Sequence, residues 1–189
     1  FSFMPAIEAN NIAGYLTMPQ GTPAEETARA LQRLEAGAHE LAEELRDELG
    51  GEPVRHILTS IGDQPFRSAE GPGALTVSAD VSSGHLGEVN LELAPAEERA
   101  IGSTEIARRW RQKVGAVPDA VELTYSASLF SSGEAINVEL SGPDVGRLRQ
   151  FATALKDELR TYPGVQDISD SFRAGKKELP KPIATILAV

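Results

Sequence analysis

Alternating apolar and polar positions predict two strands in the middle of the chain. Residues 87–93 (GEVNLEL) alternate with the period of a half-buried strand, and Pro95 ends the pattern. Residues 121–125 (VELTY) alternate in the same way. A strand-like run also occupies residues 74–81, and a polar break at 82–85 separates it from the first strand. The centre of the chain is therefore expected to be rich in strands.

A helical pattern lies between the two alternating segments. Ile106, Trp110 and Val114 recur at four-residue spacing, which places them on one face of a helix. Ser103 is expected to cap the start of this helix and Gly115 to end it. The segment therefore predicts an amphipathic helix whose apolar face lies on the sheet.

The N-terminal part of the chain predicts a strand, a long helix, a second strand and a loop. Residues 12–18 and 54–61 are the strands, and the segment 62–73, which is rich in Gly, Pro and Ser, is the loop. Thr22 is expected to cap the helix, with Pro23 at its first position and Glu25 reaching back to complete a capping box. The apolar stripe of this helix consists of Leu31, Leu34, Ala38, Leu41, Leu45 and Leu49.

Taken together, these elements give the order βαββαβ over residues 12–127. This is the order of the split βαβ, or ferredoxin-like, α+β sandwich, in which two helices cover one face of an antiparallel sheet. The rest of the chain repeats the beginning of the plan, with strands at 135–140 and 165–172 around a helix that Asp144 opens. This second βαβ unit is incomplete and would leave a sheet edge bare, so we expect the natural protein to continue beyond Val189.

Composition restricts the chemistry that the chain can perform. It has 189 residues, no cysteine, and a net charge of -10 from 18 basic and 28 acidic side chains. Without cysteine it forms neither disulfides nor thiolate metal sites, and the acidic excess disfavours nucleic acid as a partner. No segment approaches the ~20 consecutive apolar residues of a membrane-spanning helix.

Candidate chemical groups are few. His39, His56 and His85 are scattered without the spacing of a metal site, and no serine lies in a nucleophile-elbow motif. The arginines around Trp110 resemble a nucleic-acid patch only in isolation, because helical spacing places Trp110 in the core and the arginines in solvent. We therefore expect no enzyme activity, no cofactor and no metal.

Several short motifs occur in a particular order along the chain. They lie at 3–8 (FMPAIE), 18–23 (MPQGTP), 84–89 (GHLGEV), 140–144 (LSGPD), 162–165 (YPGV), 170–172 (DSF) and 175–179 (GKKEL), together with Leu93, Pro95, Glu98, Arg99, Trp110, Arg111, Val114, Gly115 and Pro118. In their order and spacing they resemble the periplasmic porter region of resistance–nodulation–division (RND) efflux permeases of the acriflavin-resistance type.

The resemblance implies a division of the chain into parts of a larger transporter. Residues 1–11 would follow a first membrane helix, 12–127 would be the first N-terminal porter subdomain, and 128–179 would be part of the second. Residues 180–189 depart from the family pattern. The family transports by proton-driven antiport as a trimer, on the periplasmic face of the bacterial inner membrane. This fragment of such a multidrug transporter would form part of the substrate passage, without transporting alone.

The resemblance also implies partners and lining residues. The partners would be the parent trimer, a periplasmic adaptor, an outer-membrane channel and small amphiphilic substrates. Phe130 and Phe172 are the candidate substrate-lining residues, with ordinary core packing as the competing and favoured interpretation. The alternative functions are a free-standing ferredoxin-like module that binds a small ligand or regulates, and a hydrolase with an unrecognised site. An apolar run of ~20 residues just before Phe1 would favour the transporter.

Overall fold

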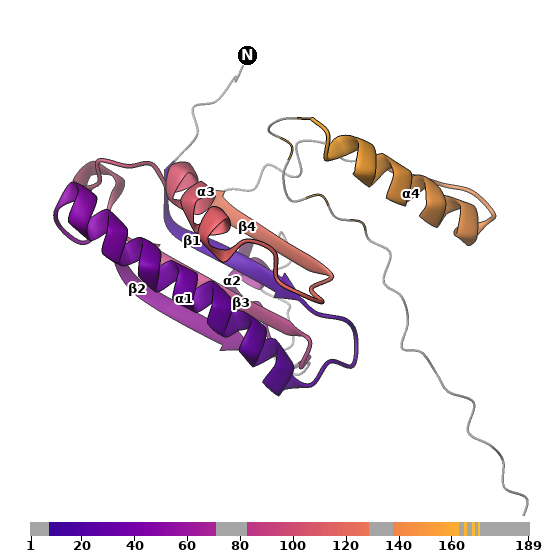
Figure 1. Ribbon diagram of the computed structural model, residues 1–189, viewed down its shortest axis with the longest axis horizontal. Coiled ribbons are helices and arrows are strands. Elements are labelled where there is room, and N and C mark those ends of the chain that lie inside the picture. Colours follow the sequence, from indigo (N-terminus) through magenta and orange to yellow (C-terminus); the bar gives the residue numbers. More distant parts are fainter. Residues whose placement is uncertain are drawn as a thin grey trace, which may run out of the picture.

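The computed structural model describes residues 8–70, 83–128 and 138–162, together with Val165, Ile168 and Asp170. A four-stranded antiparallel sheet with the order β2-β3-β1-β4 forms its centre, and two long helices lie on one face of this sheet (Figure 1). The elements in chain order are β1 (Glu8–Thr17), α1 (Ala24–Leu49), β2 (Val54–Ile61), α2 (Pro65–Glu70), β3 (Leu86–Leu93), the 3-10 turn η1 (Ala96–Glu98), α3 (Ser103–Val114), β4 (Glu122–Ser128) and α4 (Val145–Leu159). The predicted α+β class and ferredoxin-like sandwich are confirmed.

The core lies between the sheet and the helices α1 and α3. Strand alternation turns one set of side chains towards the helices, where Ile12, Leu16, Val89 and Leu91 are fully buried. The predicted stripe of α1 meets them, because Leu31, Leu34, Ala38, Leu41 and Leu45 are also fully buried. Leu49, the last member of that stripe, is only partly buried.

Trp110 connects the two helices to the sheet. Its indole Nε1 donates a hydrogen bond of 2.9 Å to the main-chain carbonyl of Leu34 on α1. Its ring meets that of Tyr125 on β4 edge to face, with centroids 4.9 Å apart. Beneath it lies Gly14 of β1, where a Cβ atom would stand only 2.9 Å from Cη2 of Trp110. The indole therefore requires a bare backbone at residue 14.

The first helix begins differently from the prediction. Pro23 is the N-cap of α1 and has no side-chain capping bond, so the predicted capping box is wrong. The hydroxyl of Thr22 instead donates to the carbonyl of Pro19 at 2.7 Å, which closes the turn between β1 and α1. Because the carbonyl of Pro19 lies within reach in this short turn, the hydroxyl of Thr22 bonds to it and does not cap the helix.

Two further segments differ from the prediction. The first strand begins at Glu8 rather than at residue 12, and its pairing with β4 shifts register between Glu8 and Ala13. This irregularity breaks the apolar alternation, so the beginning of the strand is hidden in the sequence. Residues 65–70, expected to be loop, form α2. The expected extended run at 74–81 lies outside the described residues.

The second unit is confirmed only in its helix. Asp144 caps α4, with its carboxylate accepting the N–H of Arg147 at 3.1 Å. Residues 138–140 and the described residues beyond 163 form no strand, and the rest of both predicted strands lies outside the described residues. No described residue of α4 is buried, and Phe151 of its predicted stripe is 67% exposed. Figure 1 shows α4 apart from the sheet, and the second βαβ unit as a whole stays a prediction.

Substituting Gly14→Ala is expected to lower the free energy of unfolding by about 1–3 kcal/mol, because the added methyl group overpacks the indole of Trp110. Urea unfolding monitored by tryptophan fluorescence measures the change. Gly142→Ala is the matched control, since a Cβ there would lie at an ordinary 3.6 Å from Leu148. Equal stability of Gly14→Ala and the wild type would show that Trp110 moves aside without cost.

Candidate functional site: a cleft at the end of the sheet

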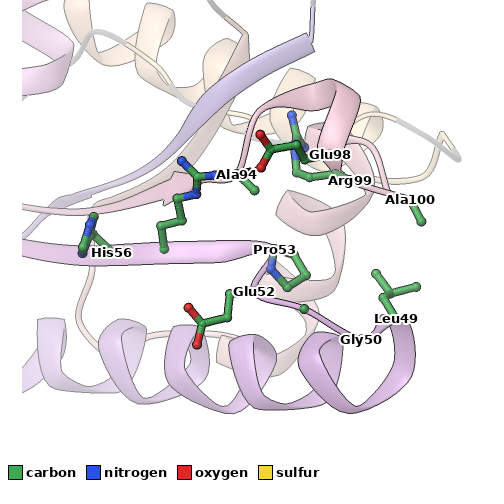
Figure 2. A pocket seen from close by; sticks show the side chains of 11 residues that line it. Leu49, Gly50, Glu52, Pro53, His56, Ala94, Glu98, Arg99 and Ala100 are labelled. Atoms are coloured by element: carbon green, nitrogen blue, oxygen red, sulfur yellow. Dashed lines mark hydrogen bonds and ion pairs between the residues drawn. The ribbon is translucent and has the colours of Figure 1, made fainter.

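A cleft of about 520 Å³ opens where the turn between α1 and β2 faces the connection between β3 and α3. Figure 2 shows Glu52 and Pro53 on the turn, with Glu98 and Arg99 on the connection across from them. The lining residues are Leu49, Gly50, Gly51, Glu52, Pro53, Arg55, His56, Ala94, Glu98, Arg99 and Ala100.

The turn on one side of the cleft depends on two glycines. Gly50 and Gly51 have φ angles of 68° and 95°, in the left-handed region that side chains disfavour. Gly50 ends α1 by donating its N–H to the carbonyl of Arg46 at 3.0 Å. The chain then reverses into β2 without placing a side chain at either position, which leaves this side of the cleft open.

An ion pair bridges the rim of the cleft. Arg55 of β2 lies 2.8 Å from the carboxylate of Glu98 in η1. The pairing of β2 with β3 shifts register between Val54 and His56, so Arg55 is the extra residue of a bulge at the edge of the sheet. The side chains of Arg55 and Glu98 are 44% and 57% exposed. An ion pair so exposed contributes only about 0–1 kcal/mol, so it can open at little cost.

The guanidinium of Arg99 forms the buried part of the site. Its side chain is 1% exposed, and it donates to the carbonyls of Ala9 at 2.9 Å and Ile101 at 3.3 Å. Its Nε has no hydrogen-bond partner among the described residues. Burial lowers the pKa of Arg99, while the nearby carboxylate of Glu8 opposes that shift. Arginine stays charged in proteins, so a positive charge lies beneath the cleft.

Glu8 supplies the counter-charge and caps α3. Its carboxylate lies 3.6 Å from Arg99 and accepts the main-chain N–H of Ser103 at 2.7 Å. The hydrogen bond from Ser103 lowers the pKa of Glu8, and the charge of Arg99 adds to that effect. The predicted cap by Ser103 is wrong: Gly102 is the N-cap, and the hydroxyl of Ser103 donates to Ala127 on β4 at 3.2 Å.

Sequence reasoning did not identify Glu8 as a capping residue, because it lies far from α3 along the chain. Its membership in the 3–8 motif is the one signal that singled it out. The sequence around Glu98 and Arg99 predicts a solvated helix entry with a local ion pair, but the side chain of Arg99 is buried and its partner is Glu8. A capping box is recognised from local spacing, whereas this cap comes from the first strand.

The predicted lining residues Phe130 and Phe172 lie outside the described residues, so their role stays a prediction. Of the histidines, His56 lines the cleft, His39 is exposed on α1, and His85 lies in the turn before β3. Among residues that the structure describes, no group of His, Asp and Glu is placed to hold a metal ion.

The predicted burial of Trp110 is confirmed, but of the arginines around it only Arg108 is exposed, since Arg109 is half-buried and Arg111 lies over the ring of Tyr125. Trp110 is fully buried, while Arg109 forms ion pairs with Glu44 and Glu48 on α1 and Arg108 pairs with Glu105. The ion pairs of Arg109 with α1 join the two helices on their solvent side. Within the described part of the chain, no helix has the length and apolar character needed to cross a membrane.

Charged groups of two kinds define the cleft. The buried guanidinium of Arg99 lies beneath it, and the exposed ion pair of Arg55 with Glu98 closes its rim. Its walls come from the turn between α1 and β2, from the start of β2 and from the connection to α3.

Comparison with solved structures finds this fold within a heavy metal efflux pump. Crystal form II of that pump matches with a TM-score of 0.59 at 22% identity, over 88% of this chain and 16% of the pump chain. Crystal form I matches with a TM-score of 0.53 at 22% identity, over 87% and 16% of the two chains. This chain thus spans a small part of the pump's length, and the likeness is one of fold. No protein-family model and no curated protein sequence match the chain.

The variant Arg99→Ala is expected to lower the free energy of unfolding by about 2–3 kcal/mol, because it leaves the carboxylate of Glu8 and two part-buried carbonyls without their donor. Arg55→Ala is the matched control from the same cleft and is expected to cost about 0–1 kcal/mol. Urea unfolding of both variants makes the comparison. Equal costs would contradict the assignment of Arg99 as the buried anchor.

The depressed pKa of Glu8 predicts an acid-dependent loss of stability. The folded pKa lies below the unfolded value of 4.5, so the stabilisation is present above pH 4.5 and is lost as the pH falls through the folded pKa. The variant Glu8→Gln should therefore lose less stability than the wild type between neutral pH and about pH 3. Glu92→Gln, which removes an exposed carboxylate on β3, is the control and should follow the wild type. Parallel pH profiles of Glu8→Gln and the wild type would contradict the prediction.

Proposed function

We propose that this chain is part of the porter region of an RND efflux transporter and forms part of its substrate passage. The observation that carries the proposal is the extent of the fold likeness. The sandwich of residues 8–128 makes up only about two-thirds of the chain, whereas the match to the efflux pump covers 88% of it. A ferredoxin-like sandwich alone supports many functions, but a match that continues past it supports a shared larger architecture.

The sandwich suits a part that moves as a rigid body. Arg109 bridges Glu44 and Glu48 across the helices, and Lys113 lies 2.6 Å from Glu44. Together with the shared core, these contacts hold α1 and α3 in one layer on the sheet. In a transporter whose passage opens and closes between such units, each unit must keep its shape while its neighbours rotate against it.

The proposal extends to the activity of the whole protein. The parent protein would work by proton-driven antiport as a trimer on the periplasmic face of the inner membrane, with an adaptor and an outer-membrane channel as partners. Residues that carry protons would lie outside this chain, which would act as scaffold and passage wall without enzymatic activity.

Composition supports organic substrates over soft metal ions. The chain has no cysteine, two methionines and three histidines. Thiolate, thioether and imidazole groups are the ligands that soft transition metals prefer, and this chain offers few of them. We therefore propose small amphiphilic molecules as the substrates, with Phe130 and Phe172 as candidate lining residues.

The test begins with the complete reading frame that contains this chain. The transporter proposal requires apolar segments of ~20 residues flanking the porter region. Cells that lack their own efflux pumps and express the complete protein should then accumulate less of a fluorescent amphiphilic dye than cells without it. A complete reading frame without such segments would instead favour a free-standing ligand-binding module.

Substitutions in the complete protein test the passage directly. Phe130→Ala and Phe172→Ala are expected to change the relative export of different dyes, with the amount of protein in the membrane unchanged. Phe151→Ala is the matched control, because this side chain is 67% exposed on α4. Unchanged export profiles for both lining variants would show that these phenylalanines pack in a core instead.

A further inference from the structure

The second face of the sheet carries a polar cluster beneath α2. The strand alternation that points Leu16 and Gly87 towards α1 points Tyr15 and Glu88 the other way, and these two residues are paired across β1 and β3. α2 lies against these same two strands, on the side opposite to α1 and α3 (Figure 1).

Two side chains anchor α2 through its backbone and its entry turn. Gln64 donates from its amide to the carbonyls of Leu16 at 2.9 Å and Gly87 at 3.2 Å. The carboxylate of Glu88 accepts the main-chain N–H groups of Phe66 at 3.0 Å and Arg67 at 3.4 Å. These bonds hold the main chain of α2 and do not involve the guanidinium of Arg67.

The guanidinium of Arg67 occupies a separate set of contacts. It lies 3.1 Å from the carboxylate of Glu122 on β4, and its Cζ is 5.1 Å from the ring centroid of Tyr15. It also donates to the amide oxygen of Gln64 at 3.4 Å. An aromatic face, a carboxylate and an amide oxygen around one position are the chemistry that recognises an organic cation.

The exposed fractions of these side chains separate Arg67 from the three groups that its guanidinium contacts. Tyr15 is 4% exposed, Gln64 7% and Glu122 7%, so the groups that contact the cation are buried. The side chain of Arg67, by contrast, is 45% exposed. The position over Tyr15 is therefore reached from solvent, and the arginine can leave by side-chain rotation while α2 stays anchored.

We propose that Tyr15, Gln64 and Glu122 form a binding site for a guanidinium or primary ammonium group, which Arg67 of the same chain occupies in this structure. Arg67 then acts as an internal competitor, and an external cation binds when it displaces that side chain. A buried carboxylate beside an aromatic ring strengthens the attraction because little water screens it. The proposal concerns this chain alone and does not depend on the transporter assignment.

The test removes the competitor and supplies a probe. Arg67→Ala in the full 189-residue chain is titrated with ethylguanidinium at constant ionic strength, with binding followed by nuclear magnetic resonance. We expect Arg67→Ala to bind ethylguanidinium roughly tenfold or more tightly than the wild type, with the ring signals of Tyr15 shifting. Ethylurea, a neutral molecule of similar shape, should not bind.

Two further variants locate the binding. Adding Glu122→Gln to Arg67→Ala should abolish the gain, whereas Arg29→Ala, which removes an arginine from an exposed ion pair on α1, should produce none. Hydrogen exchange at the amide of Phe66 reports whether α2 remains in place. If Arg67→Ala loosens it, Arg67→Gln retains a polar side chain there and is titrated instead. Binding no tighter than in the wild type, or equal binding of ethylurea, would overturn the proposal.

Discussion

The contact of Trp110 with the bare backbone of Gly14 sets the spacing between the helical layer and the sheet. The indole is the largest fully buried side chain, and it reaches the sheet only because residue 14 has no side chain. The same ring is tied to α1 through the carbonyl of Leu34 and to β4 through Tyr125. One residue thus connects four elements, and because interiors are close-packed, a shift in any of them is felt by the others.

Different interactions hold the helices on the two faces of the sheet. The face under α1 and α3 is apolar, and its burial supplies most of the stability of the sandwich. The other face buries the carboxylates of Glu88 and Glu122, which would be costly without donors such as the N–H groups of α2 and the guanidinium of Arg67. α2 is therefore held by polar contacts of specific geometry.

Charged residues far apart in the sequence also form the end of the sandwich. Glu8 begins β1, caps α3 and pairs with Arg99, so the entry of the chain into the sheet is coupled to the start of α3. The cleft lies directly beside this arrangement, between the turn into β2 and the connection that carries Arg99. In the proposed porter region, such coupling would transmit movement of the N-terminal segment to the helical layer without deforming the core.

The pattern of apolar and polar residues was sufficient to predict the helices and strands that have a regular period. The order βαββαβ, the bounds of β2, the buried stripe of α1 and the cap of α4 by Asp144 all follow from neighbouring residues, because periodicity reports which side of an element faces the core. The second unit, by contrast, was inferred from a weak repeat, and most residues of its predicted strands lie outside the described part of the chain. Phe130 and Phe172, chosen by resemblance, lie beyond the described part.

Tertiary structure alone decided the contacts between distant segments. In the sequence, Gly14 is an ordinary strand residue, Glu8 precedes the first predicted strand and Arg67 belongs to a predicted loop. The fold places Gly14 under an indole, Glu8 at a helix start and Arg67 over an aromatic ring. The physical reason is register: which residues meet across the sheet depends on how the strands align, and that alignment is set by the packed core as a whole.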